Sequence, residues 1–405
     1  MKICFIATRH RLDDARVVHK EAQSLVSAGH EVILLLCVND NNEYLQYDGS
    51  VLAKSDDERA ALEYMNMKIF GFPKRTGILG KIKMLREMSL FASSLDVDAF
   101  HVHEPDLALA IGIRAKILSI KHNNKTPALV HDFHEYPPGQ AADAVNYVLK
   151  PVVSLSHKLW LRLTMRWVDH VFTANSIVRG FVYSLDHMSR IDVLYNVPKL
   201  SPSSLREIDK VDYESEPLVI CHEGSLPFNR GLRQMIDVLE RLQDKIHLLI
   251  IGDVFGEEKR WLENEISMRE LENSITITGW LPYSEIDQKL NEAHMGLILF
   301  QELINNRLAG PPNKLFNYMR AGLPVISVDF PEMRRIITEE NCGVLLKDQS
   351  VTGISQKIEQ LMHHRDALVT MGENGQKAVR NRYSWDKMEK RLLHAYAEIK
   401  NDGCK

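Results

Sequence analysis

The sequence predicts an α/β protein with two doubly wound, Rossmann-like domains. Apolar strand-like runs alternate with helical patterns in both halves of the chain, which is typical of β-α-β units and parallel sheets. The alternation is interrupted once, by the polar and charged segment 201–217. Because 405 residues are enough for two large cores, we expect an N-terminal domain over 1–200, a linker over 201–217 and a C-terminal domain over 218–382.

In the N-terminal half, short apolar runs predict strands, and the segments between them predict helices. The expected strands are Lys2–Ala7, Glu31–Val38, Met67–Phe72, Ala99–His103, Ala128–His131, His170–Ala174 and Ile191–Leu194. The expected helices begin at Asp13 or Asp14, Lys81, Pro105, Gln140 and Ser176, the last as an N-cap. Residues 40–66 are polar and weakly periodic, so we expect loop with short helix there.

The C-terminal half repeats the alternation, which predicts a second parallel sheet. Its expected strands are Leu218–His222, His247–Gly252, Ile275–Thr278, Gly296–Phe300, Val325–Val328 and Val344–Leu346. Its expected helices are Leu232–Leu242, Glu257–Leu271, Ser284–Ala293, a helix that starts at Asn313, and Ile354–His363.

Composition excludes several classes of protein. Charged residues make up 26% of the chain but leave a net charge of only −4, which argues against a general nucleic-acid binder. The five cysteines form no Cys-x-x-Cys pair, and three of them lie in apolar strand-like runs, as core thiols of a reducing compartment do. No apolar run approaches the roughly 20 residues that span a bilayer, and the N-terminus does not resemble a signal peptide. We therefore expect a cytoplasmic protein.

The stretch from Asn305 to Asp329 predicts a loop, a short helix, a glycine stop and a buried strand. Asn313 is the expected N-cap, Gly322 occupies the position of a left-handed C-terminal residue, and Pro324 prevents the helix from continuing. The N–H groups of Asn313–Leu315 and the positive end of the helix dipole suit a phosphate. Lys314 lies in the first turn, where the dipole disfavours a cation unless an anion is bound nearby. The alternative is a buried crossover helix without a ligand.

The loop Glu223–Gly231 (EGSLPFNRG) also joins a strand to a helix. Gly224 allows a tight turn, and Gly231 allows a close approach of backbones. Arg230, at the entrance of the following helix, can bind a diphosphate through two parallel hydrogen bonds. The alternative is an exposed cation in a turn.

Polar side chains follow the ends of two strands in the N-terminal half. The loop Thr8–Asp14 (TRHRLDD) lacks the glycines of a dinucleotide-binding turn. The strand Ala99–His103 ends in a polar group, His101, His103, Glu104 and Asp106. We expect His101 and His103 to point to opposite faces of the sheet and thus not to share a metal ion, and we expect His103 to line a cleft.

A third polar group follows the strand Ala128–His131. The segment HDFHEYPPG places His131, Asp132, His134 and Glu135 within five residues. Clustered titratable groups at the carboxyl end of a strand indicate acid–base or electrostatic catalysis. The alternative is a polar loop that caps a helix.

These segments resemble the family 4 retaining glycosyltransferases, which have the GT-B fold. PPNKLFNYMRAGLPVIS resembles the signature helix of that family, although Ala309 and Asn317 stand where the family has two Glu residues. HDFHEY resembles the D-x-H-E loop of the active site, and EGSLPFNRG resembles a diphosphate loop in which Arg230 replaces Lys. The start of the chain, with Asp14 and Arg16, also resembles that of the family.

The resemblance implies a GT-B architecture in which the two domains face a central cleft and residues 383–405 form a helix that crosses back to the N-terminal domain. It implies transfer of a sugar from a UDP- or GDP-linked donor to an acceptor hydroxyl with retention, in bacterial surface polysaccharide or glycoconjugate synthesis. No metal or other cofactor is required, because cations and a helix dipole meet the diphosphate. The catalytic residues would be His134, Asp132 and Glu135. The diphosphate would be bound by Arg230, Gly224, Asn313, Lys314 and Leu315; the ribose and base by Asn317, Gly252, Asp253, Gly279 and Trp280; the acceptor by Arg9, Asp14, Arg16 and His103.

Two other functions use the same fold. A non-hydrolysing sugar-nucleotide epimerase would bind a nucleotide sugar without an acceptor, and a catalytically silent partner subunit would fit the absence of both family carboxylates at Ala309 and Asn317. Release of free nucleotide would distinguish a transferase from both.

Two cationic helices suggest contact with the inner face of a membrane and with a glycan or lipid-linked acceptor. The first carries Lys81, Lys83 and Arg86, and the second carries the cations Lys150, Lys158, Arg162 and Arg166 with Trp160 and Trp167. A solvated helix face, or a packed helix with snorkelling cations, is the alternative.

Overall fold

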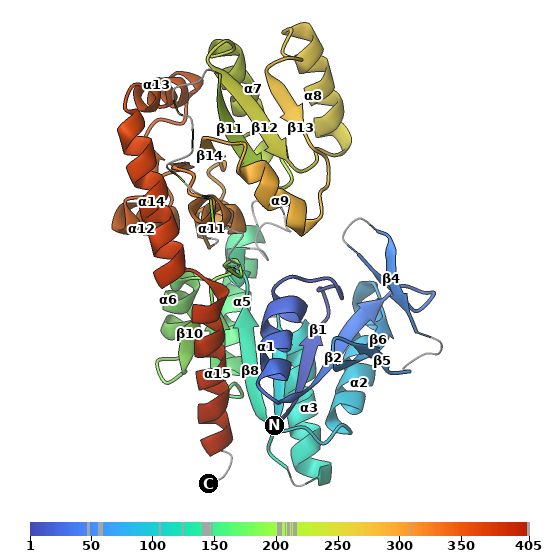
Figure 1. Ribbon diagram of the computed structural model, residues 1–405. Helices are drawn as coiled ribbons and strands as arrows, with labels where there is room; N and C mark the ends of the chain where they lie inside the picture. The colour runs from blue at the N-terminus through green and yellow to red at the C-terminus, as the bar shows by residue number, and fades with distance from the viewer. Residues whose placement is uncertain are drawn as a thin grey trace. The chain divides into compact units, whose positions relative to one another are not determined.

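The computed structural model describes the chain as two compact units. Unit 1 comprises Met1–Tyr195 and Met388–Lys405, and unit 2 comprises Asn196–Lys387 (Figure 1). The described residues are all of 1–405 except 47–48, 56–59, 105–106, 124, 140–145, 147–148, 201–204, 207, 209–210, 212, 214–216, 309 and 403–405.

Some predicted features lie outside the described residues. These are the helix start at Pro105 with Asp106, most of the expected start of the helix at Gln140, most of the linker 201–217, and Ala309.

The sheet of unit 1 has eight strands in the order β10-β9-β8-β7-β1-β2-β6-β5, of which all but β5 run parallel. The strands are β1 (Lys2–Ala7), β2 (Glu31–Val38), β5 (Leu62–Tyr64), β6 (Met67–Pro73), β7 (Ala99–His103), β8 (Ala128–Phe133), β9 (His170–Thr173) and β10 (Ile191–Val193). From β1 the sheet continues through β2, β6 and β5 to one edge, and from β7 it continues through β8, β9 and β10 to the other edge. The carboxyl ends of β1 and β7 therefore border the point where the strand order reverses, the usual position of a ligand site in such sheets.

The prediction of loop with short helix over 40–66 is wrong. The strands β3 (Glu43–Leu45) and β4 (Val51–Lys54) form an antiparallel hairpin, and β5 pairs antiparallel with β6. The turn between β5 and β6 places Met65 at φ 51° and Asn66 at φ 62°. Two successive positive φ angles are the geometry of a tight hairpin turn, which usually has Gly at one of these positions. Because this turn contains no Gly, the sequence carried no hairpin signal.

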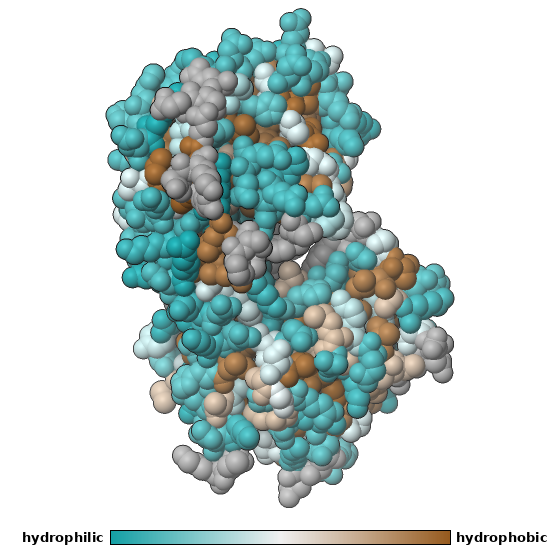
Figure 2. Space-filling model, viewed as in Figure 1, coloured by the Kyte–Doolittle hydropathy of each residue, from teal (hydrophilic) through white to brown (hydrophobic). Residues whose placement is uncertain are grey.

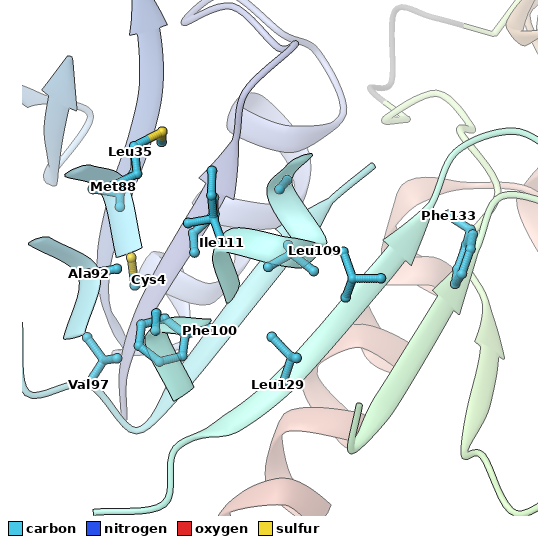
Figure 3. Close-up of a cluster of buried hydrophobic side chains, with 14 of the residues drawn as sticks. Cys4, Leu35, Met88, Ala92, Val97, Phe100, Leu109, Ile111, Leu129 and Phe133 are labelled. Atoms are coloured by element: carbon cyan, nitrogen blue, oxygen red, sulfur yellow. The ribbon is translucent and has the colours of Figure 1, made fainter. Parts of the chain in front are cut away.

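Helices cover both faces of the sheet of unit 1. The core in Figure 3 forms on one face, where α2 and α3 pack on β1, β7 and β8 through side chains such as Met88, Ile111 and Phe100. The helices on this face are α2 (Gly77–Ser93), α3 (Leu107–Asn123), α5 (Lys150–Met165) and α6 (Ser176–Leu185). Three helices lie on the other face: the short η1 (Val17–Ala22) and α1 (Gln23–Ser27), and the C-terminal α15 (Trp385–Asp402). On this face the Tyr396 hydroxyl of α15 lies 3.0 Å from His101 Nδ1.

Unit 2 contains one six-stranded, all-parallel sheet in the order β13-β12-β11-β14-β15-β16. The strands are β11 (Leu218–Glu223), β12 (Ile246–Ile251), β13 (Ile275–Ile277), β14 (Met295–Ile298), β15 (Val325–Val328) and β16 (Gly343–Leu346). The helices are η5 (Phe228–Arg230), α7 (Leu232–Arg241), α8 (Gly256–Met268), α9 (Tyr283–Leu290), α10 (Ile304–Leu308), α11 (Asn313–Arg320), α12 (Pro331–Glu340), α13 (Val351–Met362) and α14 (Arg365–Asn381). Here the strand order reverses between β11 and β14. The α/β class with parallel sheets is confirmed.

Helix α11 is buried along almost its whole length. Every residue from Lys314 to Arg320 is buried, so the helix lacks the solvated face that most surface helices have. A Cβ atom at Gly296 of β14 would overlap the ring of Tyr318, so the glycine makes room for the tyrosine. Gly322 has φ +68°, which confirms the predicted left-handed stop.

Two predicted N-caps are wrong by one residue. Asn175 rather than Ser176 precedes α6, and its side chain accepts a hydrogen bond of 2.9 Å from the N–H of Val178. Pro312 rather than Asn313 precedes α11, without a side-chain cap. Each cap is the last residue with extended backbone, and the predicted residue has already entered the helix.

Most of the surface visible in Figure 2 is hydrophilic, as expected for a chain with 26% charged residues. Among the described residues, no helix combines the length and the apolar character needed to cross a membrane.

Candidate active site

Polar side chains gather at the reversal point of each sheet. In unit 1 they form an acid–base cluster, which we define as His10, Asp14, Arg16, Glu21, His103, Glu104, Asp132 and His134. In unit 2 they form a cation cluster, which we define as His222, Glu223, Arg230, Lys314 and Asn317.

Arg16 is the centre of the acid–base cluster, and it is only 4% exposed. Its Nε donates to Glu21 Oε1 at 2.8 Å, its Nη2 donates to Asp132 Oδ1 at 2.8 Å, and its Nη1 donates to the carbonyl of Leu194 at 2.8 Å. Asp14 Oδ1 accepts the backbone N–H of Arg16 at 2.9 Å, which fixes the turn that carries the guanidinium. The N-cap of η1 is Arg16, without a side-chain cap, so the prediction of a cap at Asp13 or Asp14 is wrong, although Asp14 Oδ1 also accepts the N–H of Val17 at 2.8 Å. Arg16 joins three separate segments of unit 1 rather than presenting its donors to solvent.

Glu21 and Asp132 share one guanidinium and differ in charge. Burial alone would raise the pKa of Asp132, but the charge of Arg16, with His134 and His103, holds that pKa well below its usual value. Burial and the charge of Asp132 raise the pKa of Glu21 well above its usual value. Near neutral pH, Asp132 is therefore ionised and Glu21 is protonated.

His134 lies at the edge of the acid–base cluster, with a side chain 14% exposed, and Asp132 is fully buried behind it. His134 Nε2 is 2.8 Å from Asp132 Oδ2 and 3.2 Å from His103 Nδ1. Since Asp132 is ionised, the proton of a neutral His134 belongs on Nε2, and Nδ1 is left as the basic nitrogen. A histidine oriented by a buried carboxylate is the usual arrangement of a general base.

The four polar residues of HDFHEYPPG do not form one group. His131 lies on the other face of β8, with its ring centroid 3.9 Å from that of Phe133, and burial lowers its pKa to about 3. Glu135 is exposed to solvent. Only Asp132 and His134 of this segment belong to the acid–base cluster, because alternate residues of a strand point to opposite faces.

The expectation that His101 and His103 point to opposite faces is wrong. The two residues are two positions apart on β7, so the strand period of two places them on the same face. Their rings stack with centroids 4.5 Å apart, and both are fully buried. Burial lowers the pKa of His103 to about 4 and holds the pKa of His101 well below its usual value, so both rings are neutral.

Two groups of side chains bring potential metal ligands within 4.8 Å of one another. The first is Glu21, His101, His103 and Asp132, and the second is His10, Glu104 and His134. In the first group, the Arg16 guanidinium is paired with the ionised Asp132, and Glu21 holds a proton. In the second, His10 holds a proton and is a hydrogen-bond donor instead of a ligand. Charges and hydrogen bonds of the protein itself thus occupy part of both groups, while Glu21 Oε2, His101 Nε2 and His103 Nε2 are buried without a hydrogen-bond partner among the described residues.

His10 and Glu104 form an ion pair beside His134. His10 Nδ1 is 2.9 Å from Asp14 Oδ2, and His10 Nε2 is 3.5 Å from Glu104 Oε1. Burial alone would lower the pKa of His10, but hydrogen bonds and charges of Asp14 and Glu104 raise it to about 9. Arg9 reaches Glu104 at 3.8 Å from a side chain that is 53% exposed. The sequence indicated this loop by its place after β1 but assigned no site role to His10, nor to Glu21, which was matched only to the start of the family.

In the cation cluster, Lys314 is buried without a carboxylate in hydrogen-bond contact. Its Nζ lies 2.8 Å from His222 Nε2. Burial, followed by the charge of Arg230, lowers the pKa of Lys314 to about 7. The guanidinium carbon of Arg230 lies 4.4 Å from the ring centroid of Phe300, and Lys314 Nζ lies 6.0 Å from the same centroid. Two cations are therefore held near one aromatic ring, where they repel each other.

The other members of the cation cluster are Asn317 and Glu223. Asn317 Nδ2 donates to Glu223 Oε1 at 2.7 Å, and the N–H of Glu223 donates to the Tyr318 hydroxyl at 2.8 Å. Neither Glu223 nor His222 was among the site residues predicted from the sequence. The available signal was their position at the end of the central strand β11.

Glycine turns surround the cation cluster. Gly224 has φ +89° and Gly231 φ +87°, and a Cβ at Gly231 would overlap Leu299, so both predicted backbone roles are confirmed. A Cβ at Gly252 would lie 2.6 Å from the carbonyl oxygen of Gly224, which shows that the turns after β11 and β12 touch.

The remaining predicted donor residues differ in accessibility. The N–H of Leu315 donates to the carbonyl of Pro312 at 2.9 Å, so it is not available to a ligand. Asp253 Oδ1 accepts the N–H of Val254 at 2.8 Å. Gly279 has φ +70°, and Trp280 is 64% exposed. The roles of Asp253, Gly279 and Trp280 in donor binding stay predictions.

The two halves of the chain match two glycosyltransferase models. Residues 15–197 match the model described as Glycosyltransferase Family 4, and residues 205–378 match the model described as Glycosyl transferases group 1.

Relatives and solved structures agree with these matches. The uncharacterized glycosyltransferase MJ1069 of Methanocaldococcus jannaschii is 20% identical over 254 residues, which cover 59% of this chain and 61% of that protein. The amylovoran biosynthesis glycosyltransferase AmsK of Erwinia amylovora is 26% identical over 151 residues, 36% of this chain and 37% of that protein. The matched regions thus span less than two thirds of these relatives. The structure of Anabaena Alr3699/HepE in complex with UDP and glucose aligns over 98% of this chain and all of that one, with 15% identity and a TM-score of 0.68. This likeness shows the GT-B fold.

Asp132→Asn should destabilise unit 1 far more than Glu21→Gln. Asparagine leaves the buried Arg16 without its ionised partner, which costs about 3 kcal/mol. Glutamine replaces a carboxyl group that is already neutral, so its cost should be well below that. Urea unfolding of both variants measures the difference. Equal losses would contradict the assignment of the negative charge to Asp132.

The stability of unit 1 should depend on pH through His10. The folded pKa of His10, about 9, lies above its ordinary value of 6.5. Its ion pair therefore contributes fully below about pH 6.5, and the contribution is lost as the pH rises through 9. The gap in unfolding free energy between the wild-type protein and His10→Asn should shrink by up to about 3 kcal/mol across this window. A gap that is constant between pH 6 and 9 would contradict this.

Proposed function

The chain belongs to the family 4 glycosyltransferases of GT-B fold, and we propose that it transfers a sugar from a nucleoside-diphosphate donor to an acceptor hydroxyl with retention at the anomeric carbon. The sugar–phosphate bond breaks, the acceptor oxygen bonds to the anomeric carbon, and the acceptor proton passes to the departing phosphate.

The observation that carries this proposal is the pair Lys314 and Arg230. Two cations close to one aromatic ring, one of them buried with its pKa lowered to about 7, form a site that is stabilised by adding an anion. Lys314 also lies in the first turn of α11, where the helix dipole attracts a phosphate. These groups would stabilise the charge that develops on the departing diphosphate, so no metal ion is required.

The acid–base cluster supplies the second part of the proposal. His134 would lie near the reacting sugar, whose carbon becomes positively charged as the bond to phosphate breaks. Asp132, ionised behind His134, lies 2.8 Å from Nε2, which leaves Nδ1 as the basic nitrogen, and its charge stabilises positive charge nearby. In this proposal unit 1 binds the acceptor and unit 2 binds the donor.

The relatives suggest the donor and the pathway. HepE was solved with UDP and glucose, and AmsK is named for amylovoran biosynthesis, so we infer a UDP-linked sugar and a role in polysaccharide or glycoconjugate synthesis.

We also infer that unit 1 binds an anionic membrane surface, where a lipid-linked acceptor would be found. Four apolar side chains of α5 lie on one helical face and are between 52% and 69% exposed: Val152, Leu155, Leu159 and Leu163. Lys158, Arg162 and Arg166 accompany them, and residues 150–168 contain no Asp or Glu. Exposed apolar side chains distinguish this helix from a packed one whose cations merely snorkel.

Helix α2 repeats this pattern. Ile78, Leu79 and Ile82 are each more than half exposed, beside Lys81 and Lys83. Apolar groups that enter the lipid and cations that attract its headgroups are the two requirements of an interfacial helix.

Arg230→Ala and His134→Ala should separate binding from catalysis. The Arg230 variant should bind UDP at least about tenfold more weakly, because it loses charge-assisted hydrogen bonds to the diphosphate. The His134 variant should bind UDP normally and lose about 100-fold or more in turnover. Calorimetry with UDP, after a thermal-shift panel of UDP, GDP, ADP and CMP, measures the binding, and release of free nucleotide measures turnover.

Arg233→Ala is the matched control, since Arg233 packs on the ring of Phe228 at 4.0 Å in the same region. Unchanged UDP affinity in Arg230→Ala would remove the diphosphate from this loop. Full activity in His134→Ala would remove this residue from the mechanism.

The double variant Leu155→Ser/Leu159→Ser should weaken binding to vesicles of phosphatidylcholine with phosphatidylglycerol by about tenfold or more, because two apolar side chains no longer enter the lipid. Met268→Ser, at an exposed apolar position of unit 2, is the control. Co-sedimentation measures binding, which should also fall with added salt. Equal sedimentation of all three proteins, or binding to phosphatidylcholine alone, would contradict an anionic surface at α5.

A further inference from the structure

We propose that Glu223 supplies a carboxylate that accepts a hydrogen bond from a hydroxyl group of the nucleotide-sugar donor, and that it does so in place of a carboxylate at position 317. The inference rests on the proposed function and deepens it, because it assigns a residue that selects donor hydroxyls.

Glu223 occupies the position in unit 2 where ligands of parallel sheets bind. It is the last residue of β11, and the strand order reverses between β11 and β14. The next residue, Gly224, has φ +89° and turns the chain away from the strand. The side chain of Glu223 thus lies at the carboxyl end of a central strand, where the charge of Lys314 acts on it.

One carboxylate oxygen of Glu223 has a hydrogen-bond partner and the other has none. Oε1 accepts from Asn317 Nδ2 at 2.7 Å. Oε2 is buried, and within the described part of the chain no group donates to it or accepts from it. A buried polar atom without a partner is unfavourable whether the carboxyl is ionised or protonated. A ligand group that hydrogen-bonds Oε2 would remove that cost.

The neighbouring charges identify the chemistry of this ligand group. Lys314 and Arg230 suit a diphosphate, whereas a carboxylate repels one and accepts hydrogen bonds from hydroxyl groups. A ligand that satisfies all three side chains carries hydroxyls close to a phosphate. In a nucleotide sugar, both the ribose and the sugar meet this description.

Asn317 explains why the carboxylate can be on β11. An amide at position 317 donates to Glu223 at 2.7 Å, whereas a carboxylate there would place two negative charges in contact. The family that the sequence resembles has Glu at the position of Asn317. In this chain the amide is on helix α11 instead, and the carboxylate is on strand β11.

The experiment compares four proteins: the wild-type chain, Glu223→Gln, Asn317→Glu, and the double variant Glu223→Gln/Asn317→Glu. Calorimetry measures their affinities for UDP, its 2′-deoxy and 3′-deoxy analogues, and UDP-glucose. Glu257→Gln, at an exposed position of α8, is the control for an unrelated loss of charge.

We expect Glu223→Gln to bind at least about tenfold more weakly, because it loses a hydrogen bond to a charged acceptor. Asn317→Glu should also bind more weakly, and the double variant should recover affinity relative to both single variants because it exchanges the amide and the carboxylate. A loss seen with UDP but not with a deoxy analogue assigns the contact to a ribose hydroxyl. A loss confined to UDP-glucose assigns it to the sugar.

Affinities of Glu223→Gln equal to those of the wild-type chain for every ligand would overturn this inference alone. A double variant no better than Glu223→Gln would also overturn it, because the exchange of carboxylate and amide would then have no effect. A wild-type chain that binds neither UDP nor UDP-glucose would overturn the proposed function and this inference with it.

Discussion

The buried ion pair between Arg16 and Asp132 is the interaction on which unit 1 depends. A guanidinium that is 4% exposed is tolerable only when its donors are used, and here they hold two carboxylates and the carbonyl of Leu194. The same pair keeps Asp132 ionised, which orients His134 and leaves Glu21 with a proton. The geometry of the acid–base cluster therefore follows from the need to neutralise one buried cation.

Unit 2 also buries a cation, Lys314, but its surroundings differ from those of Arg16. Helix α11 buries Lys314 and Asn317 beside the end of β11, but Lys314 contacts a neutral histidine instead of a carboxylate, and Arg230 repels it. The acid–base cluster contains carboxylates paired with Arg16 and His10, whereas in the cation cluster the charge of Arg230 helps to lower the pKa of Lys314. In the proposed function, the acid–base cluster stabilises charge on the reacting sugar, and the cation cluster binds the diphosphate.

Errors in the sequence-based expectations have specific physical causes. The hairpin turn at Met65 and Asn66 adopts positive φ angles without glycine, so neither β5 nor its pairing with β6 left a turn signal. The stacked pair His101 and His103 follows directly from the period of a strand, and the expectation of opposite faces misapplied that period. Both N-caps were assigned one residue late, where the backbone is already helical.

The sequence by itself determined the alternation of strands and helices, the glycine positions at Gly224, Gly231 and Gly322, and the strand ends at which polar groups gather. These features are local, since each depends on a few neighbouring residues and their backbone angles. Only the tertiary structure decided which side chains meet: Arg16 and Asp132 are 116 residues apart, Asn317 and Glu223 are 94 apart, and Tyr396 and His101 are 295 apart. Such contacts depend on how distant strands and helices pack, and so do the burial and charge that set the pKa of each group.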